Sequence, residues 1–148
     1  MQLSGASILA HLTLVWTFYN IVLAAAENVT IHNDNPSIIY SEGDWKFEDD
    51  YSSGATDHWS GDTGAWASFT FTGVAIYYSV HLYPWNIPAG GRFFLDGNSE
   101  GNIRLFDPRA DDYADVGTIV WSRTGLENTQ HTLKVQISDD FITLDTLV

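Results

Sequence analysis

From residue 27 onward, short runs of alternating apolar and polar residues recur roughly every ten residues, a pattern typical of half-buried antiparallel strands. The clearest run is Gly64–Thr72, in which Phe69 and Phe71 fall on one face. Val74–Tyr83 continues the alternation, and we expect Gly73 to turn the chain between the two strands. The other predicted strands are Val29–Ile31, Ser37–Ser41, Asp44–Glu48, Arg92–Asp96, Asn102–Phe106, Thr118–Ser122, Gln130–Ser138 and Phe141–Val148.

No segment after residue 26 shows a sustained helical period. Strands without helices must bury their apolar faces against one another, so the pattern predicts a β-sandwich of two antiparallel sheets. We find no internal repeat, Pro-rich linker or low-complexity segment. Residues 27–148 are therefore expected to form a single domain, in which Gly125 provides a turn that allows a final hairpin.

Residues 1–26 differ from the rest of the chain. Ile8–Ala26 contains no Asp, Glu, Lys or Arg and ends in three alanines, as expected for a secretory signal peptide. The run is also long enough for an uncleaved signal anchor, which remains the alternative. Asn28-Val29-Thr30 is an N-glycosylation sequon, whereas Asn35 is followed by Pro36 and is not usable. These features predict a protein that is secreted or held at the extracellular cell surface, with Asn28 as its glycosylation site.

The chain of 148 residues is strongly acidic: six Lys and Arg stand against nineteen Asp and Glu, for a net charge of −13. This charge argues against nucleic acid and anionic membrane surfaces as partners, because both would repel it. Neutral ligands such as sugars remain compatible, and a bound cation is favoured. There is no cysteine, which excludes disulfides and thiolate metal sites.

Several motifs occur in a characteristic order along almost the whole predicted domain. They are Val29–Tyr40, Gly43-Asp44-Trp45, His58-Trp59, Gly64–Tyr77, Asp96-Gly97, Gly125–Val135 and Phe141–Val148. The series resembles an extracellular jelly-roll domain common in secreted and single-pass membrane proteins of basidiomycete fungi. More distantly it resembles galactose-binding-like carbohydrate-binding modules of families 6 and 35. The resemblance implies a jelly-roll β-sandwich. The chain departs from the family pattern at Thr146, because in the family an aromatic residue usually follows the aspartate that corresponds to Asp145.

Aromatic faces that stack on sugar rings, together with nearby polar groups, are what a shallow glycan site requires. Trp85 lies in the proline-containing segment Tyr83–Gly91, where it either stacks on a sugar or folds back over the edge of the sandwich. Trp45 and Trp121 fall within strand patterns and are expected in the core, while Trp66 faces away from Phe69. The predicted ligand-binding set is Trp85, Trp59 and Tyr113 for stacking, with His58, Asn86 and Arg109 for hydrogen bonds; packing or turn roles remain the alternative for Trp59 and Tyr113.

In the modules that this chain resembles, a structural calcium ion often joins an early loop to the last strand. Calcium prefers six to eight oxygen ligands. By this resemblance Asp145 supplies one ligand and Asp34 another. The alternative is that Asp145 accepts hydrogen bonds from backbone amides. Asp107 and the acidic residues that follow it show no EF-hand order and are expected in a solvated loop.

Catalytic signatures are missing from the sequence: there is no Gly-x-Ser-x-Gly elbow, no His-Glu-x-x-His helix and no phosphate-binding glycine loop. We therefore expect a non-catalytic module that binds neutral glycan at the fungal surface or on cell-wall polysaccharide. The alternative is a structural or adhesive ectodomain that acts through protein contacts or self-association.

Overall fold

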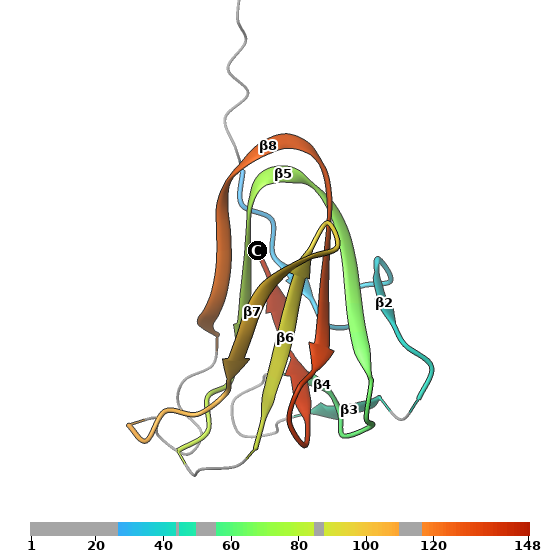
Figure 1. The fold of residues 1–148 in the computed structure, drawn as a ribbon, viewed down its shortest axis with the longest axis vertical. Coiled ribbons are helices and arrows are strands. Elements are labelled where there is room, and N and C mark those ends of the chain that lie inside the picture. Colours follow the sequence, from blue (N-terminus) through green and yellow to red (C-terminus); the bar gives the residue numbers. More distant parts are fainter. Residues whose placement is uncertain (1–26, 44, 50–55, 85–87, 110–116) are drawn as a thin grey trace, which may run out of the picture.

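The computed structural model describes residues 27–43, 45–49, 56–84, 88–109 and 117–148. Within these residues the chain forms strands and no helix, so the all-β prediction is confirmed (Figure 1). The strands are β1 (Ile31–His32), β2 (Ile38–Tyr40), β3 (Lys46–Asp49), β4 (Thr56–Ser60), β5 (Trp66–Val80), β6 (Gly90–Leu95), β7 (Asn98–Arg104), β8 (Thr118–Ile137), β9 (Ile142–Leu144) and β10 (Thr146–Leu147). None of the ranges described contains a helix that is long and apolar enough to cross a membrane.

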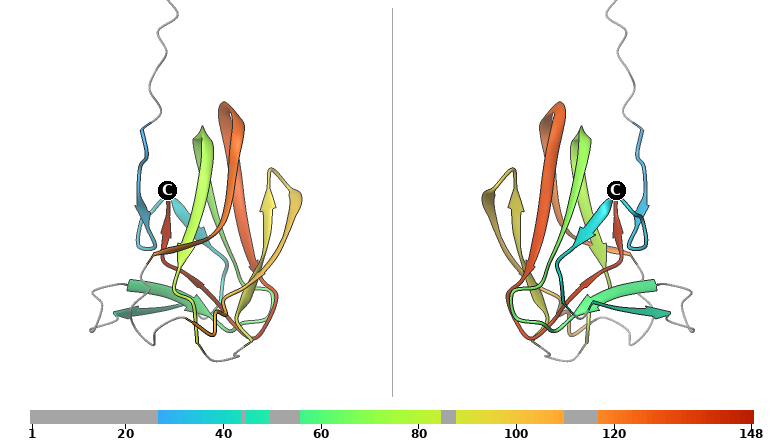
Figure 2. Two further views of the ribbon diagram at one scale, coloured as in Figure 1. Left: turned by 90° about the vertical axis from the view of Figure 1, so that its left-hand side faces the viewer. Right: turned by 90° about the vertical axis from the view of Figure 1, so that its right-hand side faces the viewer.

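The strands form two antiparallel sheets, as predicted. The larger sheet has the order β1-β10-β5-β8-β6-β7, with β2 also paired to β5. The smaller sheet has the order β3-β4-β9. In both side views of the molecule, which show opposite sides, the β3 and β4 strands run across one end of the larger sheet (Figure 2). Because the chain passes from β9 in the small sheet directly into β10 in the large one, Asp145 lies at the junction between the sheets.

The larger sheet folds back on itself because β5 and β8 are long and bend together into an arch (Figure 1). The first leg of β5 pairs with β2 and with Thr129–Gln136 of β8, whose second leg in turn pairs with β6. The second leg of β5 pairs with β10 and with Thr118–Thr124 of β8. One continuous pair of strands thereby supplies both layers of a sandwich.

The core fills the space between these layers. Phe93, from β6 in one layer, is fully buried and contacts two aromatic rings of the other layer. Its ring centroid lies 5.0 Å from that of Tyr78 in an edge-on arrangement and 4.8 Å from that of Trp121 in a stacked one. Such aromatic pairs contribute about 0.5–1.5 kcal/mol beyond the area they bury. Trp121 therefore packs against the core as predicted, and Trp45 also packs there.

Two predictions about local structure are wrong, and one strand was not predicted. Gly73 does not separate two strands, because Trp66–Val80 is one strand with a register shift at Gly73/Ala75. A bulge there shifts the buried positions from Ala65 and Ala67 to Ile76 and Tyr78, which explains the change of phase in the sequence. Gly125 likewise lies inside β8, with a φ of 72° where that strand bends. Finally, Thr56–Ser60 is a strand that the polar composition of this segment concealed.

Candidate functional site

His58 and Trp59 follow one another in β4, so their side chains point to opposite faces of the small sheet. The Nδ1 atom of His58 lies 3.0 Å from the backbone oxygen of Asn33 and 3.1 Å from the hydroxyl of Tyr40. That hydroxyl donates a hydrogen bond of 2.6 Å to the same backbone oxygen. Burial, together with the nearby charge of Asp34, raises the pKa of Tyr40. This side of β4 anchors the first strands of the domain.

Trp59, on the other face, is half-buried. The ammonium nitrogen of Lys46 lies 4.9 Å from the centroid of its ring, in a cation–π contact. The indole nitrogen is buried and finds no hydrogen-bond partner among the described residues. Because Lys46 covers one face of the ring, Trp59 offers a sugar less surface than the sequence suggested.

Of the other predicted ligand-binding residues, only Arg109 lies within the described part of the chain. Trp85, Asn86 and Tyr113 lie outside the described residues. Arg109 is exposed, and its Nε atom pairs with Asp107 at 3.3 Å. The Arg109 backbone amide, followed by its guanidinium group, lowers the pKa of Asp107. Of the predicted set, only His58 and Trp59 are brought together by the described structure, and these two face opposite ways.

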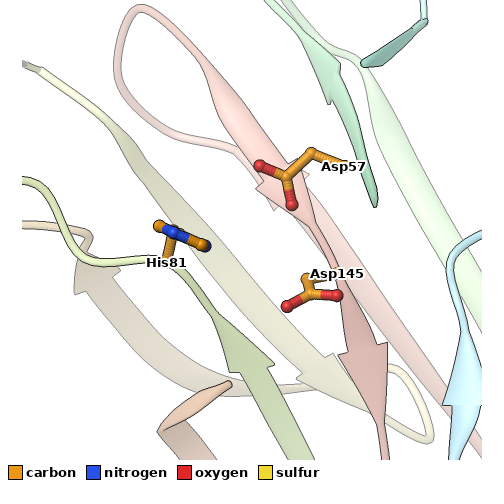
Figure 3. Close-up of side chains that lie close together, drawn as sticks. All are labelled: Asp57, His81 and Asp145. Carbon is orange, nitrogen blue, oxygen red and sulfur yellow. The ribbon is translucent and has the colours of Figure 1, made fainter. Parts of the chain in front are cut away.

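Asp145 lies in a different kind of environment, a small polar cluster that we call the Asp-His-Asp cluster: Asp57, His81 and Asp145 (Figure 3). Asp57 comes from β4, His81 directly follows β5, and Asp145 stands between β9 and β10. One potential ligand atom from each side chain lies within 4.8 Å of the other two. Strands of both sheets therefore bring together three side chains of types that can ligate a metal ion.

Burial dominates the electrostatics of this cluster. Asp145 is only 5% exposed, and its pKa is raised to about 6, first by burial and then by the negative charge of Asp57. The nearby His81 and His32 act in the opposite direction. Burial and the charge of Asp57 also raise the pKa of Tyr83. The surroundings of the cluster therefore disfavour a second uncompensated negative charge.

Asp145 was predicted as a metal ligand from the resemblance alone, with Asp34 as its companion. Asp34 is exposed and is not one of the three side chains of the cluster. The cluster offers two carboxylates and one imidazole, whereas calcium prefers six to eight oxygen ligands. These three side chains therefore fit calcium poorly, and calcium itself stays a prediction.

Sequence reasoning missed Asp57 and His81. In the sequence, Asp57 stands in a polar segment, and His81 occupies a polar position of an otherwise apolar strand. They lie 24 residues apart in the chain numbering, and 64 residues separate His81 from Asp145. No motif links them. Asp57 and Trp59 are two residues apart, so in a strand they share one face. This spacing alone could have indicated that Asp57 faces inward.

A groove of about 440 Å³ lies where β5 bends. Phe69, Phe71 and Ile76 line it from the arch. The side is lined by Glu27, Asn28, Val29, Ile31, Leu147 and Val148. The Phe69 and Phe71 rings are parallel within 4°, with centroids 6.2 Å apart, and both are partly exposed. Exposed polar residues also line the groove: Glu27, Asn28, Thr72 and Asn128.

No protein-family model matches the chain, and no curated protein sequence matches it. The function must therefore be argued from the groove, the cluster and the sequence.

Proposed function

We propose that the protein is a secreted or cell-surface, non-catalytic module of jelly-roll, galactose-binding-like type that binds neutral glycan. The observation that carries this proposal is the groove where β5 bends. It combines two parallel phenyl rings with polar residues, as sugar sites do when they stack on C–H surfaces and fix hydroxyl groups. The net charge of −13 is compatible with a neutral ligand and unfavourable for an anionic one.

Among the described residues, Phe71 is a better candidate than Trp59 for stacking on a sugar. Phe71 is partly exposed within the groove, whereas Lys46 covers the ring of Trp59. Trp85 lies outside the described residues, so its predicted role in stacking is not tested by the structure and it stays a second candidate. Asn28, the predicted glycosylation site, lines the groove itself. A glycan attached there would lie beside the bound sugar, so binding must be measured on protein with and without it.

The test is a glycan array of neutral polysaccharides and oligosaccharides, followed by calorimetric titration of the strongest ligand. Phe71→Leu retains an apolar side chain but removes the aromatic face, and we expect it to weaken binding about tenfold, the loss of roughly 1.4 kcal/mol. Phe47→Ala is the control, because Phe47 is 49% exposed on β3 and does not line the groove. Trp85→Ala distinguishes the Tyr83–Gly91 segment from the groove.

Binding of no neutral glycan would contradict the proposal as a whole. Loss of binding in Trp85→Ala with full binding in Phe71→Leu would move the site from the groove to the Tyr83–Gly91 segment. Comparison of Asn28→Gln with the wild type, both made in a glycosylating host, shows whether an attached glycan blocks the groove.

A second candidate function is adhesion through self-association. Large apolar side chains are exposed at several places: Val29 60%, Ile39 62%, Phe47 49%, Val74 40% and Ile119 56%. Ile39 lies on β2, which pairs with β5 and with no other described strand. A stable homo-oligomer in size-exclusion chromatography, combined with no affinity for sugars, would favour this function over glycan binding.

A further inference from the structure

The Asp-His-Asp cluster has the composition of a metal site, but not of the calcium site that the sequence resemblance implies. Imidazole nitrogen is a common ligand of zinc and other first-row transition metals, while calcium takes oxygen ligands. Three protein donors are also the number that many zinc sites use, with a further position left for water. The two carboxylates and one imidazole of the cluster agree with this ligand set.

Two side chains of the cluster, those of His81 and Asp145, lack the partners that buried polar groups normally have. Both ring nitrogens of His81 are buried, and neither has a hydrogen-bond partner among the described residues. Asp145 is 95% buried, from an exposed fraction of 5%, and no described residue donates a hydrogen bond to its carboxylate. In Figure 3 the three side chains face one another across a common space. A cation in this space would give the His81 ring and the Asp145 carboxylate the partner that they lack.

The position of the cluster indicates what such a cation would do. Asp57 belongs to the small sheet, His81 extends from the large sheet, and Asp145 joins the two. A metal ion held by all three would cross-link the sheets, in a chain that has no cysteine and therefore no disulfide. A metal that binds only the folded state stabilises it.

We propose that Asp57, His81 and Asp145 form a binding site for a divalent transition metal of the zinc class, which holds the two sheets together. This proposal is independent of glycan binding. It assigns Asp145 a nitrogen-containing ligand set, in place of the calcium set with Asp34.

The test uses the full protein after removal of metals with EDTA, followed by titration with Zn²⁺, Mn²⁺, Ca²⁺ or Mg²⁺ alone. We expect one Zn²⁺ per chain and a rise in the midpoint of thermal unfolding of about 5 °C or more at saturating Zn²⁺. Co²⁺ provides a direct readout, because its visible absorption reports the geometry and the nitrogen ligation of the site independently of stability.

His81→Gln and Asp145→Asn each remove one ligand and should weaken Zn²⁺ binding by more than about 100-fold, since even the loss of outer-shell partners costs 10–100-fold. Asp34→Asn is the matched control and should bind Zn²⁺ like the wild type, because Asp34 is exposed and outside the cluster. Circular dichroism of each metal-free variant establishes that it is folded before the titration is interpreted.

Two results would overturn the proposal. Calcium binding that is lost in Asp34→Asn and Asp145→Asn but retained in His81→Gln would establish the oxygen site that the resemblance implies. Failure of the wild type to bind any of the four ions at micromolar concentration would show that the cluster is not a metal site.

Discussion

At the scale of single residues, His131 shows how one side chain connects distant parts of this fold. Its Nδ1 atom lies 2.7 Å from Oδ2 of Asp96, and its Nε2 atom lies 2.9 Å from the backbone oxygen of Glu127. A carboxylate and a carbonyl oxygen only accept hydrogen bonds, so both ring nitrogens donate when the imidazole is protonated. The hydrogen bond to Asp96, followed by that to Glu127, raises the pKa of His131. Asp96 itself has its pKa lowered, first by His131 and then by the backbone amide of Thr132.

The pair predicts a defined pH dependence. The pKa of His131 in the folded protein lies above its value of about 6.5 in the unfolded chain. The stability that protonated His131 contributes is therefore complete below about pH 6.5 and is lost as the pH rises through the folded pKa. The stability that ionised Asp96 contributes is present above the pKa of Asp96 in the unfolded chain, and it is lost as the pH falls through the pKa of Asp96 in the folded protein. NMR titration should give an elevated pKa for His131 in the wild type.

Asp96→Asn is the variant that checks this explanation. Replacing the carboxylate should return the pKa of His131 toward its ordinary value of about 6.5 and reduce the pH dependence of thermal unfolding above that value. An unchanged His131 titration in Asp96→Asn would show that the contact in the structure does not determine the protonation of the ring.

At the scale of elements, the start of β6 depends on two glycines. A Cβ atom at Gly90 would lie 2.5 Å from the backbone oxygen of Ile103, and one at Gly91 would lie 2.5 Å from Cδ1 of Ile142. These distances are far below van der Waals contact. The glycines therefore allow β6 to lie close to β7 on one side and to the small sheet on the other.

We expect Gly90→Ala to destabilise the protein by about 1–3 kcal/mol, because the atom it would meet belongs to the backbone and cannot rotate away. Gly73→Ala is the matched control, since its nearest neighbour there would be Cδ2 of Phe71 at 3.7 Å, an ordinary contact. Chemical denaturation of both variants measures the difference. Equal stability of the two would contradict the packing seen at β6.

At the scale of the whole molecule, the charge of −13 results from only six Lys and Arg side chains against nineteen Asp and Glu. Arg123 and Glu100 pair at 3.3 Å, but the Arg123 side chain is 52% exposed. Exposed pairs of this kind contribute little to stability. Repulsion among the acidic side chains is therefore expected to oppose folding at low ionic strength.

This repulsion predicts that monovalent salt stabilises the protein. Between about 10 and 200 mM NaCl the screening length falls from roughly 30 Å to below 10 Å, and the midpoint of thermal unfolding should rise by a few degrees. The measurement is made with EDTA present, so that screening is separated from divalent-ion binding. A midpoint that falls with added NaCl would show that attractive pairs outweigh the repulsion.

Alternation along the chain was sufficient to predict an all-β domain with two antiparallel sheets, because a strand repeats every two residues and its buried face is visible locally. The sequence also showed that the alternation of apolar residues shifts by one position at Gly73, but it did not show which structural feature causes the shift. A turn and a bulge in a bending strand produce the same local pattern. The pairing of β5 with β8 on both sides of the bend distinguishes them.

Asp145 could be singled out from its place in the final segment, through a resemblance and not from its chemistry. Asp57 and His81 could not be singled out from the sequence, because no motif or spacing links them to each other or to Asp145. The sequence alone therefore determined the class of fold, the acidic charge and the lack of cysteine. Tertiary structure alone decided which polar side chains share a buried space, because that depends on how two sheets meet across long separations in the chain.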